Sequence, residues 1–400
     1  MSSDSGSMSS LTEDLENISS YTDLEDSELF VASQWQLIWW RFRRHKLALI
    51  ATAVVAIFYT VCLMPEFLSV HEPRSEESTR AYVPPQRVHF FDGWKPVLPY
   101  VYGLNGKRNE ITRAMEWEED KTIVRTIKYF VDGHEYEWLG LIPSNTHLFG
   151  LDYEVGKKDP VPLYFFGTDR MGRDLWSRLM YGTRISLSIG LVSVCLMLFL
   201  GVLLGGLSGL RGGMTDLVIQ RVIEFLRAIP TIPLWLALAA AVPADWGVLK
   251  IYFAITIIIS LIEWTRLARE VRGRFLSMRE EDFVIASRLY GSSELRIIFR
   301  QMLPSFYSHI IATTTLAIPA IILSETSLSF LGLGIRPPAI SWGVLLFEAQ
   351  TLQAVAKAAW LMIPGGFVLV SILAMNFMGD GCLLYTSPSP RDLSTSRMPS

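Results

Sequence analysis

The stretch Arg266–Pro304, RLAREVRGRFLSMREEDFVIASRLYGSSELRIIFRQMLP, lies between two long apolar runs and carries eight arginines. Such a charged island is too polar to span a bilayer, and it is typical of a cytoplasmic loop, because cytoplasmic loops are enriched in arginine and lysine. Inside it, the sequence predicts a short amphipathic helix over Asp282–Tyr290, ended by Gly291. A second helical run is expected to end at Leu303-Pro304.

Long apolar runs flank this island on both sides, and half of the 400 residues are apolar. Crossing hydrocarbon needs roughly 20 apolar residues. In the third run Pro230 and Pro233 are expected to bend or break the helix, and in the second run Gly201, Gly205 and Gly209 predict a close helix approach. We therefore predict an all-α polytopic membrane protein with six transmembrane helices: 47–64, 185–207, 217–242, 248–262, 307–328 and 359–378.

The order of charged and aromatic residues predicts the topology and the domains. Residues 1–33 are acidic and serine-rich, so we expect a disordered cytoplasmic tail. Residues 34–64 combine tryptophans and arginines before an apolar run, which predicts an interfacial helix and the first transmembrane helix, with the N-terminus inside. Residues 65–183 are then an external, periplasmic domain, and 184–381 are the core domain, with a cytoplasmic loop over 264–304.

The external domain is expected to contain β structure. Two strand-like segments, Thr122–Val131 and His134–Trp138, flank Asp132-Gly133, which is a strong signal for a two-residue hairpin turn. This turn would place Tyr129 opposite Tyr136. No cysteine occurs in the domain, so no disulfide is expected there.

The motifs of catalytic and metal sites are missing from the sequence. There is no GxxxxGK[ST] phosphate loop, no CxxC, no HExxH and no GxSxG, and no two histidines stand three or four residues apart. The sequence therefore predicts a non-catalytic chain with no metal site and no cofactor of its own.

The charged island resembles the EAA loop of ABC-importer permeases. The resemblance rests on Asp282-Phe283-Val284-Ile285-Ala286-Ser287, on Gly291 and on Leu303-Pro304, although Ile285 stands where that loop usually has glutamate and Ser287 where it has a second alanine. The alternative is an ordinary basic cytoplasmic loop. The resemblance implies a helix that docks on an ATPase subunit, with these coupling residues: Asp282, Phe283, Ile285, Ala286, Ser287, Gly291, Leu303 and Pro304.

Two further motifs narrow the resemblance to the C-type second permease subunit of the dipeptide/oligopeptide family. They are GTDRMGRD at 167–174 and SETSLSFLGLG at 324–334. The resemblance covers 163–381 densely and stops at Cys382. Because CLLYTSPSPRD at 382–392 looks like a translated sequencing adapter, we expect 382–400 to be a non-native read-through tail.

Some residues of these motifs admit two interpretations. The external signature either contacts a substrate-delivering protein or forms a structural turn and helix cap; its residues are Gly167, Asp169, Gly172, Arg173 and Asp174. Glu325 lies inside a predicted span, where a charge is costly. It either lines the translocation pathway or a gate, together with Ser329 and Pro319, or it hydrogen-bonds neighbouring helices.

The resemblance implies an alternating-access importer of di- or oligopeptides in the bacterial cytoplasmic membrane. The implied partners are a second permease subunit in a heterodimer, two ATP-binding cassette subunits that bind ATP and Mg²⁺, an extracytoplasmic substrate-binding protein, the peptide and membrane lipid, but no nucleic acid. The cargo alternatives are nickel, an opine, a sugar or a peptide antibiotic. The alternatives from other classes are an ATP-independent transporter or channel and a membrane-anchored binding module.

Overall fold

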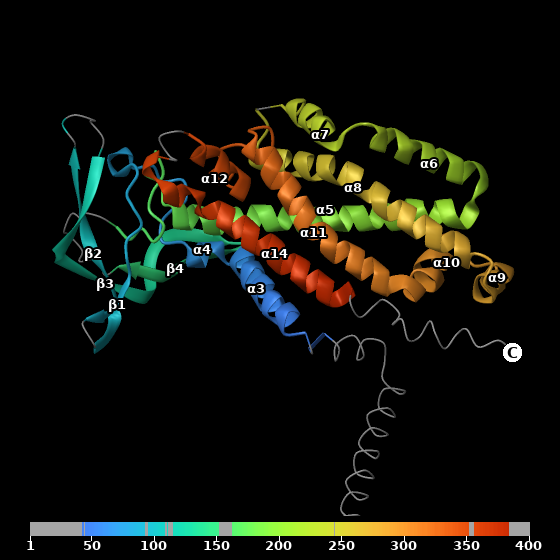
Figure 1. Ribbon diagram of the computed structural model, residues 1–400, viewed down its shortest axis with the longest axis horizontal. Helices are drawn as coiled ribbons and strands as arrows, with labels where there is room; N and C mark the ends of the chain where they lie inside the picture. Colours follow the sequence, from blue (N-terminus) through green and yellow to red (C-terminus); the bar gives the residue numbers. More distant parts are fainter. Residues whose placement is uncertain are drawn as a thin grey trace, which may run out of the picture.

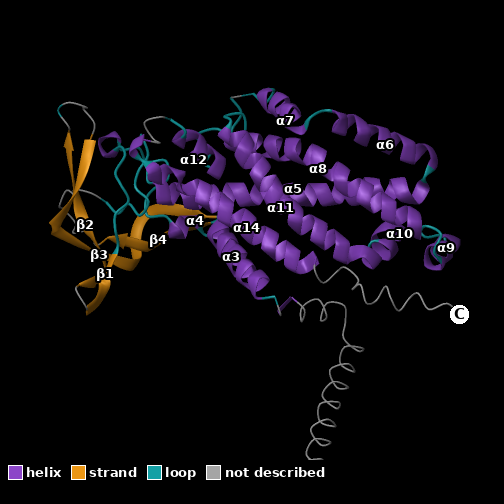
Figure 2. Ribbon diagram, in the orientation of Figure 1, coloured by secondary structure: helices purple, strands orange, loops and turns teal. Residues whose placement is uncertain are grey.

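The protein has two parts, a bundle of long helices and a small antiparallel sheet at one end of the bundle (Figure 1, Figure 2). The computed structural model describes residues 42–43, 45–92, 95–108, 110, 115–151, 162–243, 245–351 and 356–383. The predicted acidic tail 1–33, most of the predicted interfacial helix and the tail from 384 onward lie outside the described residues.

The long helices of the bundle are α3 (Lys46–Leu63), α5 (Leu175–Arg211), α6 (Gly213–Ala228), α7 (Thr231–Ala240), α8 (Val248–Met278), α11 (Tyr307–Phe330) and α14 (Ile363–Leu383). Within the described ranges, five helical runs are long and apolar enough to cross a membrane, and the bent pair α6 and α7 makes a sixth if it is one span. The prediction of a polytopic helical membrane protein with a small β-containing domain is confirmed.

Short elements connect the long helices. They are α4 (Pro65–Leu68), a 3-10 turn (Ser78–Arg80), α9 (Asp282–Leu289), α10 (Glu294–Ile297), a π-helical turn (Ile298–Met302), a second 3-10 turn (Pro304–Phe306), α12 (Trp342–Ala349) and a third 3-10 turn (Ala359–Met362).

The closest helix packing in the bundle is between α5 and α8, and it depends on the predicted glycine face. A Cβ atom on Gly205 would lie 2.5 Å from the backbone oxygen of Ala268, and one on Gly209 would lie 2.7 Å from Phe275 Cβ. A Cβ atom on Gly201 would lie 2.8 Å from a methyl group of Leu267. The prediction of a small-residue face that permits close helix approach is therefore confirmed.

The charged island begins inside a helix, which corrects one predicted boundary. The fourth span was expected to end at Ile262, but α8 continues to Met278. The extension is amphipathic, because Leu267, Val271 and Phe275 are buried at helical spacing while arginines lie between them. This buried stripe contacts the glycine face of α5, and that contact stabilises helix where the charge pattern alone indicates a loop.

Two other boundaries follow from caps and prolines. The helix α5 begins at Leu175, before the predicted start at Ile185 and before the predicted end of the external domain at 183. Its N-cap is Asp174, whose side chain accepts hydrogen bonds from the backbone N–H groups of Trp176 and Ser177. At Pro230 the chain turns by 86° between α6 and α7, as the prolines predicted.

The sheet is an antiparallel meander with the strand order β1-β2-β3-β4. Its strands are β1 (His89–Asp92), β2 (Lys95–Arg108), β3 (Met115–Trp138) and β4 (Ile142–Leu151). Both β3 and β4 contact α4, which directly follows α3. The meander thus joins the bundle through its last two strands, and Figure 1 shows β4 beside α4 at this junction.

The predicted hairpin at Asp132-Gly133 is wrong. β3 runs straight through this dipeptide, and Tyr129 pairs with Phe149 rather than with Tyr136. The register shifts between Asp132 and Tyr136, so the extra residues form a bulge. Gly133 allows the ring of His147 to approach the backbone closely, because a Cβ atom on residue 133 would lie 2.5 Å from that ring. The true turn follows Trp138.

Candidate functional site

The predicted amphipathic helix of the charged island is α9, and it ends at Gly291 as expected. Gly291 has φ +72°, a left-handed conformation that favours glycine. Its N–H donates to Arg288 O at 3.0 Å, and the N–H of Ser292 donates to Ser287 O at 3.1 Å. These two bonds form a Schellman motif, which closes the helix and turns the chain.

One side of α9 is fixed to the end of α5. Val284 is fully buried, and the Arg288 guanidinium donates to Leu210 O at 3.1 Å. The next residue of α5, Arg211, forms an ion pair with Glu294 at 2.6 Å. The helix α9 is thereby attached at the end of the bundle opposite the sheet (Figure 1).

The other side of α9 leaves apolar side chains exposed. Ile285, Leu289 and Tyr290 form this exposed apolar face, with Phe283 beside it. Six of the eight predicted coupling residues therefore lie on α9 or its cap: Asp282, Phe283, Ile285, Ala286, Ser287 and Gly291. Ser287 is half-buried and the other five are exposed.

The remaining two predicted coupling residues lie at a joint. Leu303 is buried and Pro304 opens the 3-10 turn that leads into α11. The preceding π-helical turn buries Ile298 and Met302. The charged island therefore contacts α5 at one end and continues into α11 at the other.

Glu325 lies at the centre of a buried polar network near the end of α11. Its side chain has no exposed surface, and it accepts hydrogen bonds from Ser329 Oγ at 2.8 Å and from Ser186 Oγ at 3.2 Å. Ser329 Oγ also accepts the N–H of Ile335 at 3.0 Å, and Ser186 Oγ accepts the N–H of Trp342 at 3.1 Å. The carboxyl group thus joins α5, α11 and the segment that leads into α12.

Close packing around Ser329 explains the small residues of the SETSLSFLGLG motif. A Cβ atom on Gly343, at the start of α12, would lie 2.5 Å from Ser329 Cβ. Gly334 approaches the Ser329 hydroxyl and backbone in the same way. Pro319, the third residue predicted for a pathway or gate, is buried inside α11, one and a half turns before Glu325.

The external signature forms the turn that precedes α5. Gly167 and Gly172 both have left-handed backbone angles, φ +75° and +76°, and each packs against a backbone carbonyl, that of Val83 and that of Glu77 respectively. Asp169 Oδ1 accepts the N–H groups of Met171, at 2.8 Å, and Arg173, at 3.0 Å. The signature is a folded turn with little room for other side chains at its glycines.

Asp169 and Arg173 of this turn are buried and paired. Asp169 Oδ2 contacts Arg173 at 2.7 Å and Arg178 at 2.6 Å. Glu348 of α12 contacts the same two arginines, at 2.9 Å and 2.6 Å. Burial raises the pKa of Asp174, and His71 and the bonds from Ser177 oppose this rise only in part. We call Asp169, Arg173, Arg178 and Glu348 the outer cluster.

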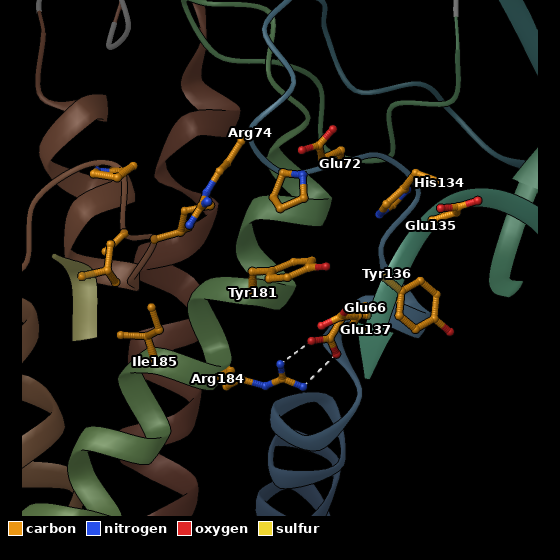
Figure 3. A pocket seen from close by; sticks show the side chains of 15 residues that line it. Glu66, Glu72, Arg74, His134, Glu135, Tyr136, Glu137, Tyr181, Arg184 and Ile185 are labelled. Atoms are coloured by element: carbon orange, nitrogen blue, oxygen red, sulfur yellow. Dashed lines mark hydrogen bonds and ion pairs between the residues drawn. The ribbon is translucent and has the colours of Figure 1, made fainter. Parts of the chain in front are cut away.

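A cavity of about 400 Å³ lies where the sheet meets the bundle (Figure 3). The strand β3 supplies Glu135 and Glu137 on one side, and α5 supplies Tyr181 and Arg184 on the other. Arg184 forms a bidentate ion pair with Glu66, and its Nη2 lies 2.7 Å from Glu66 Oε2. This pair, drawn with dashed lines in Figure 3, attaches α4 to α5 at the floor of the cavity.

Two family models match the chain. The binding-protein-dependent transport system inner membrane component matches residues 201–380, and the N-terminal TM domain of oligopeptide transport permease C matches residues 33–85. The oligopeptide transport system permease protein OppC of Bacillus subtilis (strain 168) is 35% identical over 239 residues, which are 60% of this chain and 74% of that protein. The chain belongs to the family of binding-protein-dependent transport system inner membrane components.

Two DppC permeases agree with this assignment. The dipeptide transport system permease protein DppC of Bacillus subtilis (strain 168) is 36% identical over 220 residues, 54% of this chain and 66% of that protein. The di/tripeptide permease protein DppC of Pseudomonas aeruginosa (strain UCBPP-PA14) is 38% identical over 54% of this chain and 70% of its own length. The inward-facing MetNI methionine ABC transporter has a TM-score of 0.41 at 17% identity, over 52% of this chain and 96% of that one.

The permease is therefore a membrane subunit of an ABC importer, and it is a non-catalytic transport subunit. The resemblance to peptide permeases of the C type, drawn from the motifs, is confirmed. Sequence reasoning missed Arg178, Glu348 and the Glu66–Arg184 pair. The one available signal was that Arg178 and Arg184 stand in a segment that becomes apolar, where a cation needs a buried acid.

Proposed function

We propose that the permease is the second, C-type subunit of an importer for di- or oligopeptides in a bacterial cytoplasmic membrane, with its N-terminus in the cytoplasm. The names of the relatives support the cargo, and the arginines of the α9 end support the orientation. In this proposal the partners are a second permease subunit, two ATPase subunits that bind ATP and Mg²⁺, and an extracytoplasmic substrate-binding protein.

The observation that carries the proposal is the exposed apolar face of α9. An eight-residue helix that leaves Ile285, Leu289 and Tyr290 in water exposes much apolar surface for its size. Exposed patches of this kind mark protein contacts. Because the opposite side of α9 is attached to α5, a partner bound at this face would pull on the bundle directly.

Two routes lead from α9 into the bundle. The first runs through Arg288 to Leu210 O at the end of α5, and the ion pair of Arg211 with Glu294 strengthens it. The second runs through the joint at Leu303-Pro304 into α11. We infer that movement of an ATPase partner reaches α5 and α11 together and changes which side of the membrane the pathway faces.

Substitution of Gly291 tests the coupling. Gly291→Glu places a residue with a Cβ atom and a charged side chain at φ +72°. We expect this variant to insert into the membrane, to lose peptide uptake and to hydrolyse ATP without coupling to transport. Gly291→Asn is the matched control, because asparagine tolerates the left-handed conformation. Uptake by Gly291→Glu proteoliposomes at the rate of Gly291→Asn would refute the coupling role.

A second substitution tests the docking face directly. Phe283→Asp adds a charge beside the exposed apolar face of α9 without changing the helix stop. We expect loss of uptake with normal insertion.

Ser287→Cys tests the topology, since a membrane-impermeant thiol reagent should label it from the cytoplasmic side alone. Labelling from outside would overturn the orientation.

The roles of the other predicted residues are proposals that the geometry helps to choose between. The paired, buried side chains of the outer cluster support the structural interpretation of the external signature over direct contact with a binding protein. The bonds on Glu325 support a helix-packing role, and a pathway or gate role for Glu325, Ser329 and Pro319 stays a prediction. Mass spectrometry of the cargo bound to the cognate binding protein would distinguish peptides from nickel, opines or sugars.

A further inference from the structure

The turn between β3 and β4 exposes a row of large apolar side chains. It reads Trp138-Leu139-Gly140-Leu141-Ile142, and we call these five residues the hairpin tip. Leu139, Leu141 and Ile142 are 51%, 81% and 53% exposed. A turn in contact with water is normally polar, so this composition needs a partner that removes the side chains from water.

The backbone of the hairpin tip makes the choice of leucine more unusual. Leu139 and Gly140 have φ of +52° and +70°, and the Leu141 N–H donates to Trp138 O at 3.0 Å. Turns with two successive left-handed residues favour asparagine, aspartate or glycine at the first of them. A leucine there is strained, so its presence is explained by its side chain and not by the turn.

The hairpin tip lies next to the end of the first transmembrane helix. Trp138 Nε1 donates to the backbone oxygen of Leu63 at 2.9 Å, and Leu63 is the last residue of α3. Leu63 is itself exposed, as are apolar residues of α3 that would face lipid, such as Ile57. Figure 3 shows the part of β3 with Tyr136 and Glu137 running down from the cavity toward this end of the bundle.

We propose that the hairpin tip inserts into the interfacial layer of the membrane, in the leaflet on the side of the sheet. Tryptophan prefers the headgroup level, and Trp138 is attached at the level where α3 ends. The hydrogen bond of Trp138 places the tip beside Leu63, whose side chain is exposed at the end of α3. The partner that covers the tip is therefore lipid, and the side chains of Leu139, Leu141 and Ile142 anchor the sheet to the bilayer.

The hydrogen bonds of the tip fit this environment. Lipid cannot satisfy backbone groups, so a loop that enters it needs internal partners. The N–H of Gly140 donates to Glu137 O at 3.2 Å, and that of Leu141 to Trp138 O. The exposed carboxylate of Glu137 limits the depth, because it must remain in water. We therefore place the tip within the outermost 5–10 Å or so of the leaflet, the depth typical of interfacial segments.

Spin-label accessibility tests the insertion. Leu141→Cys and the control Leu98→Cys, which is 69% exposed on β2, are made in the full chain with Cys62, Cys195 and Cys382 replaced by serine. Each nitroxide-labelled variant is reconstituted, with the subunits that copurify with it, into phosphatidylcholine–phosphatidylglycerol vesicles. We expect oxygen, which concentrates in lipid, to relax the label at 141 several-fold more than at 98, and a water-soluble nickel chelate to show the reverse order.

The outcomes separate lipid from other occupants. A label at 141 that meets the nickel chelate as often as the label at 98 overturns the proposal, because the tip is then in water. A label at 141 shielded from both oxygen and nickel also overturns it, because a protein subunit then covers the tip. Since each leucine transferred from water to lipid favours the inserted state roughly tenfold, Leu139→Ser should lower the oxygen-to-nickel ratio at 141; an unchanged ratio counts against insertion.

Discussion

The glycine face between α5 and α8 allows a sharp prediction, because the atoms that a new side chain would meet are backbone atoms. In Gly205→Ala the added Cβ would lie 2.5 Å from the oxygen, 2.8 Å from the Cα and 3.0 Å from the carbonyl carbon of Ala268. Comfortable carbon contacts begin near 3.5 Å. No rotamer change relieves the overlap, so α8 has to move away from α5 by about 1 Å.

The expected cost follows from two opposing effects. Overpacking of a well-packed contact costs about 1–3 kcal/mol. Alanine is favoured over glycine inside a helix by roughly 0.5–1 kcal/mol, and this gain is too small to reverse the sign. In α8, Gly273 has no atom within 4 Å of its ideal Cβ, so Gly273→Ala shows the gain alone. Because this gain applies to both variants, they should differ in stability by the overpacking cost alone, roughly 1–3 kcal/mol.

Thermal unfolding of the purified permease in detergent, followed by tryptophan fluorescence, measures this difference. Gly201→Ala provides a graded case, since the three atoms nearest its Cβ, at 2.8 to 2.9 Å, all belong to the side chain of Leu267 and not to the backbone. We expect the order Gly273→Ala, Gly201→Ala, Gly205→Ala from most to least stable. If Gly205→Ala unfolds at the temperature of Gly273→Ala, the close approach of α5 and α8 is not part of the folded permease.

Three further predictions concern polar groups. Arg178→Met should lower the free energy of unfolding by about 3–5 kcal/mol, because it leaves Asp169 and Glu348 buried with too little positive charge. The control Arg221→Met breaks an exposed ion pair and should change thermal stability little. Glu325→Gln should retain most stability, whereas Glu325→Leu should cost about 1–3 kcal/mol for each hydroxyl hydrogen, of Ser186 and of Ser329, left without an acceptor. Equal melting temperatures of the two variants would contradict this. Burial, with His147 and His71 nearby, lowers the pKa of His134 from 6.5 to about 4. As the pH falls from 6.5 toward 4, the unfolded state therefore binds this proton before the folded state does, and the sheet should lose stability. His134→Gln should reduce that loss in melting curves recorded at each pH.

Local signals explain which parts of the fold the sequence could predict. Apolar length indicated each span, the spacing of Gly201, Gly205 and Gly209 indicated the packed face, and Gly291 indicated the stop of α9. Each of these signals depends on a few neighbouring residues. Contacts with distant parts of the chain leave these three features unchanged.

Long-range pairing explains what the sequence could not predict. Glu348 contacts Arg173 and Arg178 from a segment far along the chain, and no local pattern relates them. The error at Asp132-Gly133 has the same origin. The dipeptide is a strong turn signal by itself, but pairing of β3 with β4 continues past it, and the glycine makes room for the ring of His147.

The helix α5 connects all the candidate sites, and this limits how the permease can work. At one end it holds α9 through Leu210 and Arg211, and at the other end it carries Arg178 of the outer cluster. With 37 residues at 1.5 Å each it is a rod about 55 Å long. Between these ends Ser186 bonds Glu325 of α11, and the glycine face packs on α8. These contacts tie both ends of α5 to its neighbours, so under the proposed coupling role of α9 we expect a displacement of α9 to reach the outer cluster through α5.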